Sequence, residues 1–221
     1  MKPPPQPLAG VFFDLDGTLV DSARDMHDAL VALCRERSLE TPGFGTMRET
    51  VSRGARAVLR CAVGNDEEQV DAMLPRFLEL YVATGMVNTC AFDGIEDVLA
   101  TLEARGVRWG VVSNKAAWLV ALVMTKLGFD RRAAAGVGGD TLAQRKPDPA
   151  PVLHACALAR VEPAWCVYVG DDPRDIQAGR AAGLYTVAAG WGYLDGADPR
   201  AWGPDATSPD PRQLAVLLGQ T

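Results

Sequence analysis

Short apolar runs that stop abruptly at polar residues recur along the chain. The first covers residues 8–13 and ends at Asp14. A run of this length that is apolar throughout is typical of a strand buried on both faces of a sheet. The pattern predicts a parallel sheet with further strands at residues 107–112, 165–169 and 184–189, and a weaker one at 133–137.

Helical periodicity occupies the intervals between these strands. Helices are predicted over residues 94–103, 115–127, 149–160 and 175–182. Alternating strands and helices are typical of an α/β, Rossmann-like fold whose parallel sheet is covered on both faces. Such sheets bind ligands at the carboxyl ends of their strands, which is where polar residues and glycines gather in this sequence.

Residues 21–89 depart from this alternation. Apolar residues recur at helical spacing over 26–33, and Ser22 is a suitable N-cap for that helix. The segment predicts an all-helical insertion. We therefore expect an α/β core formed by residues 8–20 plus 90–221, the insertion at 21–89, and a flexible N-terminus at residues 1–7.

A second helix of the insertion is expected over residues 70–81. Asn65 and Glu68 precede it at the spacing of a capping box. Pro75 lies inside the pattern, which predicts either a kink or a later helix start. Residues 196–211 are rich in Asp, Pro and Gly, and this composition predicts an irregular surface segment.

Composition narrows the range of partners. Apolar residues make up 48% of the 221 residues and charged residues 23%, which predicts a packed globular core. Lys and Arg number 22 against 28 Asp and Glu, a net charge of −6, so a nucleic-acid partner is not expected. An anionic substrate must therefore be held by a few placed cations or by a metal ion.

Histidine and cysteine usage excludes two other kinds of site. His27 and His154 are too far apart for a His-rich zinc site, and the five cysteines form no CxxC pair. An odd number of thiols in apolar stretches indicates reduced cysteines. The first apolar run is too short for a signal peptide or a membrane span, so we expect a soluble, cytoplasmic protein without a membrane partner.

The first candidate site residues are Asp14 and Asp16, directly after the first strand. If the chain turns at Gly17, both carboxylates can converge on one ligand. Asp-Gly is also a common hairpin turn, but a turn gives no reason for an acid at position 14.

Two further clusters contain groups that suit a phosphate. Ser113 and Asn114 end the next strand, where a hydroxyl and backbone N–H groups at a helix start can hold a phosphate; an ordinary N-cap is the alternative. Lys146 lies in the turn Arg145-Lys146-Pro147-Asp148-Pro149, which is rigid enough to fix a counter-charge, although a solvated lysine fits equally well.

Three carboxylates, Asp171, Asp172 and Asp175, follow the strand that ends near Gly170. They repel one another unless a cation or a helix N-terminus shares the site. Helix capping by Asp172 alone is the alternative, and it leaves Asp171 unexplained. Oxygen ligands from Asp14, Asp16 and Asp171 without His or Cys favour a hard ion, Mg²⁺.

Taken in order, these clusters resemble the four motifs of the haloacid dehalogenase superfamily of phosphatases. The motifs are Asp14-x-Asp16-Gly17-Thr18, Ser113-Asn114, Lys146-Pro147 and Gly170-Asp171-Asp172-x-x-Asp175. The helical insertion is similar to the small cap of the phosphoglycolate phosphatase branch. The resemblance covers the chain from residue 8 to about residue 193.

The resemblance implies a role for each motif. Asp14 would be the nucleophile that forms an aspartyl-phosphate, and Asp16 the general acid and base. Mg²⁺ would be held by the Asp14 carboxylate, the Asp16 backbone carbonyl and Asp171. Asp175 would brace Lys146 or the metal waters, with Asp172 in support. The phosphoryl oxygens would be held by Thr18, Ser113, Asn114 and Lys146.

Substrate choice is expected to lie in the cap. Residues 51–56 break a helical pattern with Gly54 and offer two guanidinium groups, those of Arg53 and Arg56, to a substrate carboxylate. Solvated arginines on a helix face are the alternative. This loop resembles both phosphoglycolate phosphatases and N-acetylmuramic acid 6-phosphate phosphatases.

The expected partner is a small-molecule phosphate ester, and the expected oligomeric state is a monomer or a homodimer. A phosphomutase of the β-phosphoglucomutase type would share all four motifs. A receiver-type signalling domain would share the acids, the hydroxyl and the lysine. Receivers, however, are about half as long as this chain and have no helical insertion.

Overall fold

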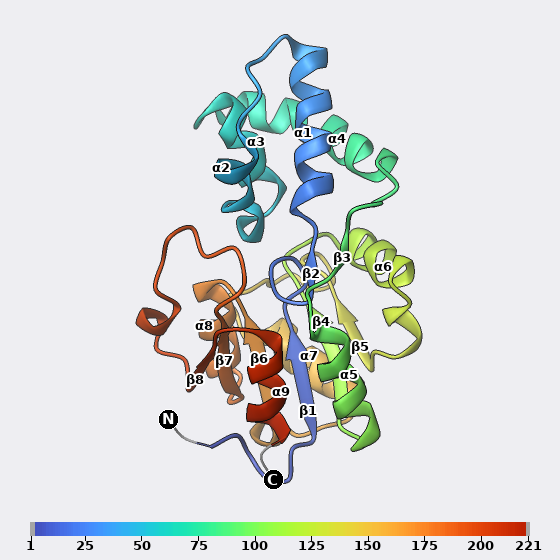
Figure 1. The fold of residues 1–221 in the computed structure, drawn as a ribbon, viewed down its shortest axis with the longest axis vertical. Coiled ribbons are helices and arrows are strands. Elements are labelled where there is room, and N and C mark those ends of the chain that lie inside the picture. The colour runs from blue at the N-terminus through green and yellow to red at the C-terminus, as the bar shows by residue number, and fades with distance from the viewer. Residues whose placement is uncertain (1–2, 220–221) are drawn as a thin grey trace. The chain divides into compact units, whose positions relative to one another are not determined.

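The chain divides into two compact units in the computed structural model, which describes residues 3–219 (Figure 1). The α/β unit comprises Met1–Val20 and Ala91–Thr221, and the helical unit comprises Asp21–Cys90. Within the predicted flexible segment 1–7, residues 1–2 lie outside the described residues.

The α/β unit is built on a six-stranded parallel sheet in the order β5-β4-β1-β6-β7-β8. This confirms the predicted α/β class with a parallel sheet. Apolar side chains fill both faces of its central strands, and Phe12, Trp109 and Tyr168 are almost wholly buried. The strands are β1 (Gly10–Phe13), β4 (Arg108–Val112), β5 (Ala135–Val137), β6 (Cys166–Gly170), β7 (Tyr185–Ala189) and β8 (Ala206–Ser208).

Helices cover both faces of this sheet because its connections run in two directions from β1. Right-handed crossovers place α5 and α6 on one face, and α7 and α8 on the other. The last helix, α9, packs on α5 (Figure 1). Their bounds are α5 Ile95–Ala104, α6 Ala117–Lys126, α7 Ala150–Ala159, α8 Pro173–Ala181 and α9 Pro211–Gly219. Short 3₁₀ turns lie at Phe129–Arg131, Pro163–Trp165 and Pro199–Trp202.

The strand register brings the predicted motifs to one edge. Phe13, the last residue of β1, is level with Val111 of β4 and Val169 of β6. The backbone N–H of Asp14 donates to the carbonyl of Val169 at 2.9 Å. The loops that follow β1, β4 and β6 therefore leave the sheet side by side.

The expectation of an irregular segment at residues 196–211 was wrong in part. Ala206–Ser208 forms β8, an edge strand paired with β7. The Asp205 carboxylate accepts hydrogen bonds from the backbone N–H and the hydroxyl of Thr186, at 2.9 and 3.0 Å. A strand of three residues carries too little periodicity to be seen among Asp, Pro and Gly, and it is defined by its contacts with β7.

The helical unit contains four α-helices packed around an apolar centre. Helix α4 packs on α1 and α3, and the side chains of Leu30, Leu33, Phe77 and Tyr81 are fully buried. The helices are α1 (Ala23–Arg37), α2 (Phe44–Arg48), α3 (Ala55–Val63) and α4 (Glu67–Ala83), with a 3₁₀ turn at Val51–Arg53. The two connections between the units pair as short strands, β2 (Val20–Asp21) and β3 (Cys90–Ala91).

One predicted helix start needs correction, and a second is confirmed in position. The N-cap of α4 is Asp66, one residue after Asn65, and its carboxylate accepts from the backbone N–H of Gln69 at 3.1 Å. Helix α4 continues through Pro75, so the proline does not delay its start, and only the hydrogen bond that this residue would donate is lost. Ser22 occupies the N-cap position of α1 but makes no side-chain cap hydrogen bond.

A buried carboxylate joins the two ends of the helical unit. Asp25, in the first turn of α1, is 0% exposed. It accepts hydrogen bonds from the backbone and side-chain nitrogens of Asn88, each at 3.0 Å, and from the Thr89 hydroxyl at 2.7 Å. These bonds tie the segment that leaves the helical unit to the helix that enters it.

We expect Asp25→Ala to lower the free energy of unfolding by about 2–4 kcal/mol, because the buried Thr89 hydroxyl and two partly buried nitrogens of Asn88 lose their acceptor. Urea denaturation followed by circular dichroism measures this change. Asp28→Ala, a partly exposed acid on the same helix, is the matched control. A loss below about 1 kcal/mol in Asp25→Ala would contradict the assigned role.

Candidate active site

A buried lysine lies at the centre of the predicted site. Lys146 is 4% exposed, and its Nζ lies 2.9 Å from Asp14 Oδ1 and 2.7 Å from Asp175 Oδ1. The same nitrogen is 2.7 Å from the carbonyl oxygen of Val112 and 3.0 Å from the hydroxyl of Tyr168. The partners of this ammonium group thus come from the residue after β1, from strands β4 and β6, and from the first turn of α8.

Negative charge exceeds positive charge among the buried groups around Lys146. Burial by itself lowers the pKa of Lys146, but the carboxylates of Asp14 and Asp175 outweigh burial and hold the pKa well above its usual value. Burial raises the pKa of the Asp175 carboxyl, and Lys146 offsets this only in part because Asp14 and Asp172 repel further negative charge. The surplus of negative charge favours a second cation.

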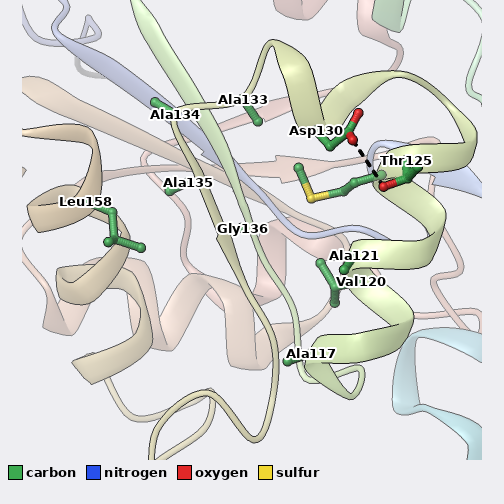
Figure 2. Close-up of a pocket in the computed structure, with 11 residues that line it drawn as sticks. Ala117, Val120, Ala121, Thr125, Asp130, Ala133, Ala134, Ala135, Gly136 and Leu158 are labelled. Atoms are coloured by element: carbon green, nitrogen blue, oxygen red, sulfur yellow. Dashed lines mark hydrogen bonds between the residues drawn. The ribbon is translucent and has the colours of Figure 1, made fainter.

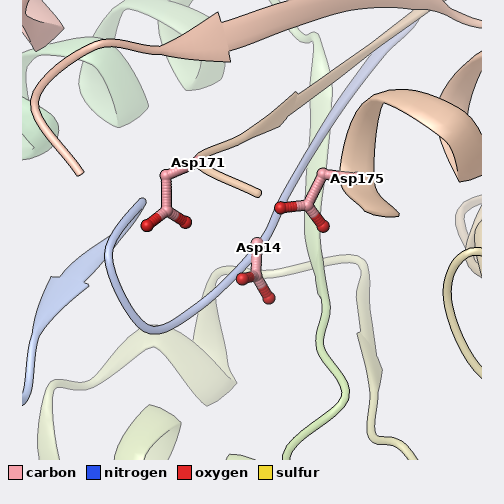
Figure 3. A group of neighbouring side chains, drawn as sticks. All are labelled: Asp14, Asp171 and Asp175. Carbon is pink, nitrogen blue, oxygen red and sulfur yellow. The ribbon is translucent and has the colours of Figure 1, made fainter. Parts of the chain in front are cut away.

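Three carboxylates are close enough to share such a cation (Figure 3). One oxygen of each of Asp14, Asp171 and Asp175 lies within 4.8 Å of the others, and all three residues are buried. An all-oxygen donor set of this kind fits a hard ion such as Mg²⁺. Asp175 was predicted only to support Lys146 or the metal waters, and its carboxylate takes part in this group.

Asp171 is held on both oxygens. The hydroxyl of Thr18 donates to Oδ1 and the backbone N–H of Tyr193 donates to Oδ2, each at 2.9 Å. Gly17 has φ +89°, and a Cβ there would lie 2.1 Å from Asp171 Oδ2. The turn after β1 therefore needs glycine both for its backbone angle and for the approach of Asp171.

The loop after β7 belongs to this site, although no role was predicted for it. The indole N–H of Trp191 donates to the carbonyl of Thr18 at 3.0 Å. A Cβ on Gly192 would lie 2.2 Å from the Cβ of Asp171. The signal was present in the sequence, because Gly-Trp-Gly follows β7 at the same edge of the sheet as the acidic motifs.

We expect Gly192→Ala to displace Asp171 and to abolish the stabilisation of the protein by Mg²⁺. The added methyl group cannot be placed without moving the side chain of Asp171. Thermal melts with Mg²⁺ and with EDTA measure the effect. Gly45→Ala is the control, since a Cβ there meets nothing within 4 Å and Gly45 does not have a left-handed backbone angle. An unchanged response to Mg²⁺ in Gly192→Ala would contradict this role.

Ser113 and Asn114 lie where they were predicted, at the end of β4. The Ser113 hydroxyl accepts from the backbone N–H of Lys115 at 3.3 Å. The Asn114 side chain donates to the carbonyl of Lys146 at 2.9 Å and accepts from its backbone N–H at 3.0 Å. The Asn114 side chain therefore fixes the backbone of Lys146. Asn114 can then hold a phosphate only through its backbone N–H.

Asp16 is not part of the carboxylate group around Lys146. Both of its carboxylate oxygens lie 3.0 Å from Nζ of Lys115, a residue to which sequence reasoning gave no role. The side chains of Lys115 and Asp16 are only 6% and 10% exposed. The two acids of the first motif thus face different lysines.

Asp172 is the N-cap of α8. Its carboxylate accepts from the backbone N–H of Arg174 at 2.9 Å, and Asp175 Oδ2 accepts from the backbone N–H of Asp172 at 3.1 Å. This reciprocal capping box holds Asp175 in place at the start of the helix. Capping thus accounts for Asp172, while Asp171 and Asp175 belong to the carboxylate group.

The residues predicted to select the substrate lie in the helical unit. Gly54 has φ +85° between the 3₁₀ turn and α3, a conformation that favours glycine. Arg56 donates to Glu67 at 2.7 Å and also contacts Asp71, so its guanidinium is engaged with α4. Arg53 is exposed at the end of the 3₁₀ turn.

A pocket lies at the edge of the sheet formed by β5 (Figure 2). Val120 and Met124 of α6, Gly136 of β5 and Leu158 of α7 line it, together with a hydrogen-bonded pair formed by Thr125 and Asp130. None of the predicted site residues contributes to its lining. Its walls are largely apolar and offer no cation for a phosphate.

Comparisons with known proteins agree with this geometry. Residues 11–189 match the model of the family described as haloacid dehalogenase-like hydrolase. A phosphoglycolate phosphatase of Xanthomonas campestris is 46% identical over 206 residues, 92% of this chain and 93% of that protein. An N-acetylmuramic acid 6-phosphate phosphatase of Pseudomonas aeruginosa is 37% identical over 214 residues, 96% of this chain and 95% of that protein.

A solved structure has the same fold as this chain. The crystal structure of a protein from Haemophilus somnus, described as a predicted phosphoglycolate phosphatase, superimposes with a TM-score of 0.84 at 25% identity. The match covers 95% of this chain and 97% of that one.

The chain belongs to the haloacid dehalogenase-like hydrolase family. This confirms the resemblance inferred from the four motifs, and with it the expectation of a phosphoric monoester hydrolase of the phosphatase type. Between residues 3 and 219, no helix is long and apolar enough to cross a membrane.

Proposed function

We propose that this chain is a Mg²⁺-dependent phosphatase that hydrolyses a small phosphate monoester through an aspartyl-phosphate on Asp14. The observation that carries the proposal is the buried group of Asp14, Asp171 and Asp175, of which Asp14 and Asp175 contact Lys146. Asp14 and Asp171 directly follow the adjacent strands β1 and β6, and Asp175 lies in the first turn of α8. The family and its phosphatase relatives support it.

In the first step, a carboxylate oxygen of Asp14 attacks phosphorus and the bond to the ester oxygen breaks. The leaving oxygen takes a proton from Asp16, so an alcohol departs and an acyl phosphate forms on Asp14. Lys146 neutralises the Asp14 carboxylate, with Nζ 2.9 Å from Oδ1. This contact fixes the direction in which the nucleophile faces.

In the second step, water gives a proton to the Asp16 carboxylate and attacks phosphorus. The bond between phosphorus and Asp14 breaks, inorganic phosphate leaves, and both aspartates return to their starting states. We assign the phosphoryl oxygens to the Ser113 hydroxyl, the backbone N–H of Asn114 and Lys146. The Thr18 hydroxyl, which the sequence also placed in this group, donates its one proton to Asp171 instead.

Asp14, Asp171 and the backbone carbonyl of Asp16 would hold Mg²⁺, with Asp175 close enough to bind the ion or its waters. When bound, the ion neutralises charge between the nucleophile and the phosphoryl group. Thr18 and Tyr193 hold Asp171 in place for this purpose.

The substrate that we propose is a phosphomonoester that also carries a carboxylate. Phosphoglycolate is the leading candidate because phosphatases named for it are 46% identical to this chain. N-acetylmuramic acid 6-phosphate is the second, because a phosphatase named for it is 37% identical over nearly the whole chain. Arg53, Gly54 and Arg56 are the residues of the helical unit that we assign to carboxylate recognition.

Phosphate release measured with Mg²⁺, and with EDTA as the control, tests this function. A preference of 100-fold or more for one carboxylate-bearing ester over para-nitrophenyl phosphate, about 2.7 kcal/mol of transition-state discrimination, would identify the substrate class. Metal-dependent release without preference would reject the carboxylate assignment. Little release, but transfer between hydroxyls that depends on a bisphosphate, would indicate a phosphomutase instead.

The arginine assignment has its own test. We expect Arg53→Ala to raise KM for phosphoglycolate at least 10-fold and to leave KM for para-nitrophenyl phosphate nearly unchanged. Arg56→Ala is the matched comparison, because a substrate carboxylate has to compete with Glu67 and Asp71 for that guanidinium. Equal losses on both esters would exclude Arg53 as a carboxylate ligand.

A further inference from the structure

The two acids of the first motif each have their own lysine. Asp14 lies 2.9 Å from Lys146, and Asp16 lies 3.0 Å from Lys115 through each of its two carboxylate oxygens. Aspartates two residues apart on a turning chain can converge on one ligand. Here they are drawn to different cations, and the Asp16 carboxylate stays outside the group formed by Asp14, Asp171 and Asp175.

Lys115 is itself held firmly. Its backbone carbonyl accepts from the N–H of Gly139 at 2.7 Å, and its own N–H donates to the Ser113 hydroxyl at 3.3 Å. A Cβ on Gly139 would lie 2.3 Å from the carbonyl oxygen of Asn114, so glycine is needed for this approach. The loop after β5 therefore clamps the segment that carries Lys115.

The ion pair is also largely removed from solvent, since the Lys115 and Asp16 side chains are 6% and 10% exposed. In a solvent-exposed ion pair, the two side chains would sample many conformations. A contact from one nitrogen to both carboxylate oxygens, in a buried place, restricts the rotation of the Asp16 side chain.

We propose that Lys115 is a positioning residue that directs the Asp16 carboxylate toward the leaving oxygen and away from the metal ligands. The inference rests on the proposed function, because it assigns a partner to the acid of the first step. Lys115 touches neither the phosphoryl group nor the metal ion in this assignment. It acts only through Asp16.

The test compares two esters that differ in their need for a proton. Phosphoglycolate must expel an alkoxide, whereas para-nitrophenyl phosphate expels a stable phenolate. The second-order constant kcat/KM reports on steps up to leaving-group departure. For Lys115→Met we expect a loss of about 100-fold with phosphoglycolate and less than about 5-fold with para-nitrophenyl phosphate.

Three comparisons separate positioning from a merely structural role. Lys115→Arg should restore part of the loss with phosphoglycolate, because it returns a cation to Asp16. In an Asp16→Asn background, Lys115→Met should not widen the difference between the esters. Lys126→Met, an exposed lysine at the end of α6, should leave both constants unchanged.

Equal losses with both esters, or no loss with either, would overturn the role of Lys115. Lys115→Gln provides the same test with a polar side chain of similar reach, should Lys115→Met fail to give the native circular dichroism spectrum. Failure of the proposed function looks different, since the unaltered protein would then release no phosphate from either ester in Mg²⁺.

Discussion

Asp14→Asn is expected to lower phosphate release by at least about 10⁴-fold while leaving the fold intact. The amide has the shape of the carboxylate but cannot form the acyl phosphate. Lys146 keeps its contacts with Asp175, Val112 and Tyr168, so the centre of the site stays paired. Release assays with Mg²⁺ and a circular dichroism spectrum measure the two parts of this expectation.

Asp97→Asn is the matched control, because Asp97 is exposed on α5 of the same unit. Its activity should equal that of the unaltered protein. Hydroxylamine added during turnover gives a second readout, since it converts an acyl phosphate on Asp14 into a hydroxamate that mass spectrometry detects. Activity of Asp14→Asn above one-hundredth of normal would exclude Asp14 as the nucleophile.

Lys146→Met is expected to lower the free energy of unfolding by about 3–5 kcal/mol. The substitution leaves the carboxylates of Asp14 and Asp175 buried without the ammonium group that joins them. Mutual repulsion and lost hydrogen bonds then act together. Urea denaturation in EDTA measures this loss.

Added Mg²⁺ should recover part of the stability of Lys146→Met, because the ion can replace some of the missing positive charge among the carboxylates. Activity should still fall by about 10²–10³-fold, since a fixed cation for the phosphoryl group is gone. Lys126→Met, which removes an exposed lysine of the same unit, should change neither quantity. A loss of stability below about 1 kcal/mol in Lys146→Met would contradict the central place given to this lysine.

The local sequence predicted what depends on short-range patterns. Buried strands are apolar throughout and can be recognised in the sequence. The predicted bounds of β1, β4, β6 and β7 therefore lie within a few residues of the observed ones. The acids followed from their place directly after those runs. By contrast, the N-cap of α4 was placed at Asn65 instead of Asp66, because both residues can cap and only the hydrogen bond to Gln69 decides between them.

Contacts between distant segments were beyond the reach of such patterns. Nothing near Ala206–Ser208 marks it as a strand, and its pairing with β7 makes it one. No role was predicted for Trp191 or Gly192 from the sequence. Trp191 donates a hydrogen bond to Thr18, and Gly192 lies against Asp171. Lys115 and Asp16 are separated by 99 positions, and no local rule pairs them.

The sequence by itself therefore determined the class of fold, the four motifs and the edge of the sheet at which they meet. These follow from burial and from strand direction, which are local properties of the chain. Tertiary structure decided which carboxylate faces which cation. Asp14 and Asp16 have the same side chain, and only the placement of Lys146 and Lys115 by other strands and loops distinguishes them.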